Sequence, residues 1–228
     1  MVTSMDIRRE DGLPIRAQEI GSGVLVAPCL VLTARHVLGE AAPSTGAQRI
    51  IEVVALPTSS TPSAGDSVAL SATIAVMGGG RAGWRRRGLL DDWALLRIKR
   101  TPTWMQPVPL DETDCCRPDG RTRAALVGFA VDHFDPAAPV AWADPDCAVV
   151  ERLANRIVAT NCLATSGNSG GPVLLKRTAG WRVGALLTRA QAPDAGGRVQ
   201  AGMNFAIPID SYLRRMVSEA QREGCESA

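Results

Sequence analysis

Short apolar stretches separated by turn-forming residues dominate the pattern along this chain. Within 68–76, hydrophobic side chains alternate with small or polar ones, which is typical of a strand with one buried face. Six stretches of this kind precede the proline-rich connector 101–109, and six follow it. The expected strands are Ile15–Ile20, Val24–Ala27, Leu30–Thr33, Ile50–Leu56, Val68–Val76, Trp93–Ile98, Ala124–Ala130, Cys147–Leu153, Arg156–Cys162, Pro172–Lys176, Trp181–Thr188 and Met203–Ile207.

One helix is expected, at the C-terminal end. Its apolar residues, Leu213, Met216, Val217 and Ala220, recur at the spacing of one helical face. Asp210 can cap its start and Gly224 can end it. The pattern therefore predicts an all-β chain with two barrels and a terminal α-helix. The expected boundaries are an N-terminal extension over 1–14, a first barrel over 15–105, a second barrel over 106–208, and a helix with its tail over 209–228.

Composition narrows the classes of partner. The 228 residues are 46% hydrophobic, enough for one folded domain or two small coupled ones. With 25 basic and 23 acidic residues the net charge is +2, which does not favour nucleic acid as a partner. No apolar run approaches the roughly 20 residues that span a bilayer, so no membrane partner is expected. The first residues mix both charge signs and lack the apolar stretch of a secretory signal, so a cytoplasmic protein is expected.

The six cysteines show no C-x-x-C spacing, and Cys115 and Cys116 are adjacent. This spacing does not favour a zinc or redox site. In a cytosol the thiols stay reduced. Cys29 and Cys162 lie in apolar runs, so they are expected to be small buried hydrophobes.

The strongest chemical signal is the segment Thr-Ser-Gly-Asn-Ser-Gly-Gly-Pro over 165–172. Its glycines allow a tight turn that exposes the Ser169 hydroxyl and points the N–H groups of Gly167 and Ser169 at one place, as a tetrahedral oxyanion requires. A serine hydroxyl also needs a base. His36 follows an apolar strand, and Asp92, which begins another, can orient the imidazole.

These segments together resemble the chymotrypsin/trypsin-like serine peptidases. The matching stretches are Gly21–Val26, Thr33–His36, Asp92–Leu96 and Gly167–Pro172, and Asn204–Pro208 is similar to the last barrel strand of bacterial HtrA-type members. The resemblance implies two perpendicular six-stranded antiparallel β-barrels with the site between them, and no metal or organic cofactor. The implied roles are nucleophile Ser169, general base His36, orienting acid Asp92, and an oxyanion hole formed by the N–H groups of Gly167 and Ser169.

The resemblance also implies a specificity pocket without an acidic floor. We expect this pocket to be apolar, to be narrowed by Met203, and to take small or medium apolar side chains. The substrate would be a protein or peptide. The implied pocket residues are Leu163, Ala164, Thr165, Ser166, Leu187, Thr188 and Met203, within the segments 163–166 and 185–188 and near 203.

One departure from the family bears on regulation. Asn168 stands where secreted trypsins carry the aspartate that pairs with a newly cut N-terminus, so no N-terminal processing is expected. Control would come from loop ordering, an activating partner or additional domains, as in bacterial regulated proteolysis, including defence systems. The alternatives are a catalytically idle domain that binds peptides or assembles a complex, and an esterase. The other histidine, His133, is expected to be structural or exposed, and Asp91 to be solvated.

Overall fold

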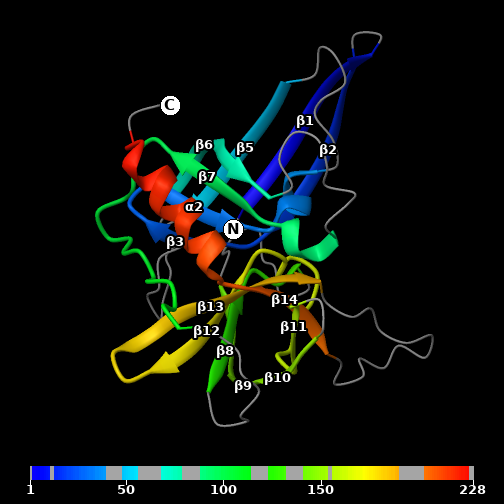
Figure 1. Ribbon diagram of the computed structural model, residues 1–228. Coiled ribbons are helices and arrows are strands. Elements are labelled where there is room, and N and C mark those ends of the chain that lie inside the picture. The colour runs from blue at the N-terminus through cyan, green and yellow to red at the C-terminus, as the bar shows by residue number, and fades with distance from the viewer. Residues whose placement is uncertain are drawn as a thin grey trace, which may run out of the picture.

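The computed structural model describes residues 2–10, 13–39, 48–55, 68–78, 88–113, 123–131, 141–153, 156–189 and 203–225. They form two curled antiparallel sheets and a C-terminal α-helix, so the predicted all-β architecture is confirmed (Figure 1). The strands are β1 (Val2–Glu10), β2 (Leu13–Gly21), β3 (Gly23–Ala27), β4 (Leu30–Thr33), β5 (Gln48–Ala55), β6 (Val68–Met77), β7 (Ala94–Ile98), β8 (Ala124–Gly128), β9 (Trp142–Cys147), β10 (Val149–Arg152), β11 (Val158–Thr160), β12 (Pro172–Arg177), β13 (Gly180–Arg189) and β14 (Asn204–Pro208). Two short 3₁₀ helices, η1 (Arg35–Leu38) and η2 (Gly88–Asp91), precede the helix α2 (Ser211–Arg222).

The first sheet has seven strands in the order β2-β1-β5-β6-β7-β4-β3. Strand β1 was not expected, because 1–14 was assigned to an extension. Instead β1 pairs with β2 and with β5, and Val2 lies opposite both Gly21 and Val53. The charged residues between Asp6 and Glu10 hid this strand, because they break the apolar alternation that marks a strand in a sequence.

The second sheet also has seven strands, in the order β10-β11-β14-β13-β12-β8-β9. Strand β9 is the one that the sequence pattern does not predict, because three prolines and Asp144 make 136–145 resemble a loop. The structure places β9 at the edge of the sheet, where a proline costs no ladder hydrogen bond. Its register sets Trp142 opposite Gly128 of β8.

One hydrophobic cluster joins the two sheets and the helix. Leu32 and Leu95 of the first sheet, Leu186 and Ile207 of the second, and Leu213 of α2 all belong to it. Each sheet also has a core of its own. Because this shared cluster excludes water, it holds together strand ends that come from distant parts of the chain.

The helix α2 forms as predicted from its apolar face, and it lies against the first sheet (Figure 1). The carboxylate of Asp210 accepts a hydrogen bond of 2.9 Å from the Leu213 N–H and so caps the start of the helix. At the other end, the guanidinium of Arg97 in β7 is buried and donates to the Ala220 carbonyl at 2.8 Å and to Glu223. A cation at this end offsets the partial negative charge of the free helix carbonyls.

The expectation of reduced thiols is wrong for four of the cysteines. Cys29 is joined to Cys225, and Cys147 to Cys162, with Cα–Cα distances of 5.7 Å and 4.7 Å. The sequence separations of 196 and 15 residues gave no hint of these pairs, since only the fold brings their Cα atoms into bonding range. Cys115 and Cys116 lie outside the described residues.

No helix in the described part of the chain is both long and apolar enough to cross a membrane.

Candidate active site

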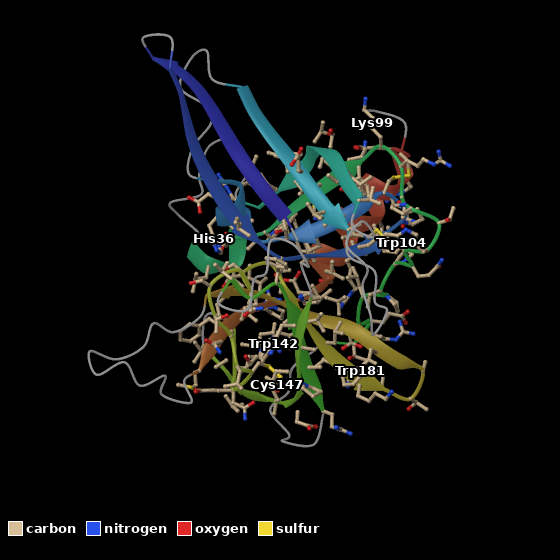
Figure 2. The ribbon with its side chains drawn as sticks, turned by 180° about the vertical axis from the view of Figure 1, so that it is seen from behind. His36, Lys99, Trp104, Trp142, Cys147 and Trp181 are labelled. Atoms are coloured by element: carbon tan, nitrogen blue, oxygen red, sulfur yellow. A yellow bond between two sulfur atoms is a disulfide. The ribbon has the colours of Figure 1, made fainter. Side chains whose placement is uncertain are left out.

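His36 and Asp92 come together because their strands are neighbours. Strand β4 ends at Thr33, three residues before His36, and pairs with β7, which begins two residues after Asp92. The register sets Thr33 opposite Ala94, so the residues just beyond this pair lie side by side at one end of the sheet. The Arg35 N–H donates to the Asp92 carbonyl at 3.2 Å and extends this pairing. Figure 2 shows the labelled His36 where the two sheets meet.

The carboxylate of Asp92 holds both the backbone and the ring of His36. Its Oδ1 accepts from the His36 N–H at 2.8 Å, and its Oδ2 lies 2.7 Å from Nδ1 of the imidazole. Because a carboxylate accepts, Nδ1 is the donor in this bond, and in the neutral imidazole Nε2 then carries the lone pair. Asp92 is buried, whereas the His36 side chain is 39% exposed. The imidazole is therefore fixed on one side and accessible on the other.

Ser169 lies in a turn that packs against the segment leading to His36. The turn uses left-handed backbone at Gly167, with φ of +90°, and at Gly170, with φ of +81°. A Cβ atom at Gly170 would collide with the Ser22 carbonyl, the Thr33 hydroxyl and the backbone nitrogen of Ala34. Only glycine fits there, and this close approach brings Ser169 beside the end of β4. No hydrogen bond joins the Ser169 hydroxyl to His36, although both residues are described.

The turn leaves two N–H groups without an acceptor. The N–H of Asn168 donates to Thr165, that of Gly170 to Leu187, and that of Gly171 to Asn168. Among the hydrogen bonds of the described residues, none uses the N–H of Gly167 or of Ser169. These are the two donors that the sequence assigns to an oxyanion hole, so the site can accept a negatively charged oxygen at this turn.

The residues expected to bind substrate fall into two groups. The side chains of Leu163 and Met203 are 55% and 43% exposed, which is unusual for large apolar residues and makes them available to a ligand. Ser166 is exposed, and Ala164 and Thr165 are half-buried. By contrast, Leu187 is fully buried in the core of the second sheet and Thr188 is nearly so, with its hydroxyl on the Phe205 carbonyl. The Leu187 side chain therefore packs in the core and is not available to a substrate.

Three polar side chains hold the backbone of segment 162–165, and the sequence pattern predicted this contact for none of them. The Asp144 carboxylate accepts from the Leu163 N–H at 2.8 Å, and the buried Asn204 amide donates to the Cys162 carbonyl at 2.5 Å. Asn168 is fully buried, and its side-chain oxygen accepts from the Thr165 N–H at 2.8 Å. Asp144 lay in a stretch interpreted as a loop, and no local pattern marks an asparagine as buried.

Asp91 differs from its expected place. It is only 6% exposed, and its Oδ2 is buried without a hydrogen-bond partner in the described part of the chain. The expectation of a solvated carboxylate is wrong, because Asp91 ends η2 three residues before β7 begins and is buried there. His133 lies outside the described residues. Within the described residues, no group of three acidic, histidine or cysteine side chains could hold a metal ion.

The comparisons with known proteins identify the family and the fold. A family model described as a trypsin-like peptidase domain matches residues 21–184, which include His36, Asp92 and Ser169. The chain belongs to this family of serine proteases. Among solved structures, it is similar to a serine endoprotease from Yersinia pestis, at 18% identity and a TM-score of 0.57. The alignment covers 98% of this chain and 64% of that one, and at this identity it shows a shared fold. No curated protein sequence matches the chain closely enough to count as a relative.

Proposed function

We propose that this protein is a serine endopeptidase that cleaves protein substrates through an acyl-enzyme on Ser169. The observation that carries the proposal is the Asp92-bound His36 beside a serine turn in which, among the described residues, the Gly167 and Ser169 N–H groups have no acceptor. An imidazole held in this tautomer is ready to accept a proton. Unused donors in a rigid turn stabilise charge that develops during the reaction.

The reaction follows from these groups. The Ser169 Oγ attacks the carbonyl carbon of the substrate while its proton passes to His36 Nε2, and the N–H groups of Gly167 and Ser169 bind the oxyanion. Collapse of the tetrahedral intermediate breaks the C–N bond, and His36 gives the proton to the leaving amine. Water then attacks the ester in the same way, with His36 again as the base, and releases the acid and Ser169.

In this proposal the Ser169 hydroxyl comes within hydrogen-bond reach of His36 Nε2 during the reaction, since no hydrogen bond joins the two described residues in the structure. Catalytic hydrogen bonds are often long before substrate binds and shorten in the complex. A substrate, an activating partner or further domains would supply this ordering. The charge-free Asn168 supports control without N-terminal processing, because its side-chain oxygen already accepts from the Thr165 N–H and hydroxyl within the turn.

A fluorophosphonate probe tests the proposal directly. Wild type is expected to form a covalent phosphonyl adduct on Ser169, visible as a mass shift on the peptide that contains it. Ser169→Ala removes the proposed attacking oxygen, so labelling is expected to vanish. Ser218→Ala, on an exposed face of α2 outside the site, is the matched control. Labelling of wild type and of Ser169→Ala to the same extent would contradict the proposal. Absence of labelling in wild type, with candidate partners present, would favour the idle binding domain.

Cleavage specificity gives a second test. The exposed Leu163 and Met203 side chains support a preference for small or medium apolar residues at the cleaved bond. Burying such a side chain against them stabilises the complex by about 25 cal/mol per Å². Mass spectrometry of a peptide library cut by wild type, with Ser169→Ala as the blank, is expected to show this preference. A profile dominated by Arg, Lys or Glu at this position would overturn it, and Asp144 would then be the first acid to test for cationic side chains.

A further inference from the structure

The sequence motif Gly21-Ser22-Gly23 has no role in the chemistry proposed so far. In the structure Ser22 is only 2% exposed and lies between β2 and β3, at the point where the first sheet meets the serine turn. Its N–H donates to the Ser169 carbonyl at 2.7 Å, and its own carbonyl accepts from the Thr33 hydroxyl at 2.7 Å. The side-chain hydroxyl of Ser22 is bonded as well.

The side chain of Ser22 bridges two parts of the second sheet. Its hydroxyl donates to the Gly167 carbonyl at 2.7 Å and accepts from the Phe129 N–H at 2.7 Å. Burying a hydroxyl costs little free energy when it both donates and accepts a hydrogen bond. If the hydroxyl is removed, the buried groups that were bonded to it lose their partner, and this destabilises the protein. The site is also tightly closed, because a Cβ atom at Gly128 would come within 3.0 Å of the Ser22 oxygen.

These bonds bear on the direction of the unused N–H groups. In a trans peptide the C=O and the N–H point in opposite directions, so a peptide is oriented by whichever group is bonded. The Ser166 carbonyl accepts from the Val131 N–H at 2.8 Å, so the Gly167 N–H of the same peptide points away from Val131. The Asn168 carbonyl accepts from the Gly171 N–H at 2.8 Å, so the Ser169 N–H of that peptide points away from Gly171.

Between these two peptides lies the one whose carbonyl is held by Ser22. The same hydroxyl also fixes Phe129, two residues before the Val131 N–H that orients the first peptide. Gly167 has left-handed backbone, and a Cβ there would meet the Phe129 carbonyl, so the turn and the Phe129–Val131 segment are in direct contact. Glycine backbone changes conformation easily, and such a turn needs an external restraint.

We propose that Ser22 is a positioning residue for the oxyanion hole: its hydroxyl clamps Gly167 to Phe129 and so keeps the N–H groups of Gly167 and Ser169 directed at the reacting carbonyl. The inference rests on the proposed function. It gives Ser22, which joins two strands of the first sheet, an indirect part in stabilising the transition state. Removing one oxyanion donor outright costs about 10²–10³ in rate. Loosening both donors without removing them is expected to cost about 10–10².

The test compares Ser22→Ala with Thr101→Val. Thr101 also forms a bond between side chain and backbone, accepting from the Cys29 N–H at 2.9 Å, but on a part of the first sheet remote from the serine turn. Saturation kinetics of fluorophosphonate inactivation give the maximal rate and the half-saturating concentration separately. Ser22→Ala is expected to lower the maximal rate by about 10–10² with little change in half-saturation, and Thr101→Val is expected to leave both unchanged.

Amide hydrogen exchange supplies a readout that does not require activity. In Ser22→Ala the Phe129 amide loses its acceptor, and the Val131 amide is expected to lose protection with it, while Thr101→Val is expected to expose only the Cys29 amide. An unchanged inactivation rate in Ser22→Ala, or equal losses in both variants that follow their melting temperatures, would overturn the proposal. If wild type does not react at all, the protease function fails. In that case, loss of Val131 protection would still support the clamp, and retained protection would overturn it.

Discussion

Asp92→Asn is expected to lower the rate of fluorophosphonate labelling and of peptide cleavage by about 10⁴, the loss seen when the orienting acid of a serine protease triad becomes an amide. In this structure the two oxygens of Asp92 accept from the His36 backbone and from Nδ1 of its ring. An asparagine has a single acceptor oxygen, so its NH₂ group faces one of these donors. With the NH₂ toward the ring, Nδ1 becomes the acceptor and the proton moves to Nε2, which can no longer take the Ser169 proton.

Asp91→Asn is the matched control for this prediction. It replaces the neighbouring buried carboxylate with the same amide, but no hydrogen bond joins Asp91 to His36 in the described structure. We expect its labelling rate to stay within a few-fold of wild type, and a thermal melt of both variants excludes unfolding as the cause of any loss. Equal losses of labelling rate at the two positions would mean that negative charge near η2 determines the rate, and not the orientation of His36.

Removing the disulfide between Cys29 and Cys225 is expected to give the largest loss of stability. The two cysteines are separated by 196 residues, and for a loop of this size the chain-entropy relation gives about 5 kcal/mol. Cys29 adopts left-handed backbone with φ of +55°, a conformation that a non-glycine residue adopts at some cost. Denaturant unfolding of the double variant Cys29→Ser, Cys225→Ser measures the loss.

The second disulfide provides the comparison. Cys147 and Cys162 are separated by 15 residues, which corresponds to about 3 kcal/mol, so Cys147→Ser, Cys162→Ser is expected to lose less. Adding a reductant should destabilise wild type but not a variant that lacks all four thiols. Alkylation of the unreduced, unfolded protein, followed by mass spectrometry, should leave these four cysteines unmodified. Free thiols at these positions in cells would instead fit the cytoplasmic location that the sequence predicts, where disulfides rarely persist.

The disulfide and Arg97 tie the helix to the strands of the active site. Cys29 directly precedes β4, which leads to His36, and Arg97 lies in β7, which follows Asp92. The helix end therefore anchors the two strands whose register sets Thr33 opposite Ala94. The labelling rate of the disulfide variant is best measured well below its melting temperature, so that the rate is that of the folded protein.

The sequence by itself determined the class of architecture and the segments of the candidate site. Alternating apolar positions predict strands because a half-buried strand has a period of two, and the short glycine-rich segment around Ser169 predicts a turn because few other residues allow its backbone. These are local properties, readable from neighbours along the chain. The local pattern does not predict strands β1 and β9, because charged residues and a proline interrupt it. These strands form because they pair with partners elsewhere in the sheet.

Only the tertiary structure decided which distant groups meet. The bond between His36 and Asp92, the two disulfides, the burial of Asp91 and the bridge from Ser22 to Gly167 and Phe129 all join residues whose surroundings are set by sheet register and by the shared core. No local pattern encodes these contacts, because a hydrogen bond or a disulfide depends on positions within a few ångströms. Such positions are fixed when the apolar faces of both sheets are buried together, and not before.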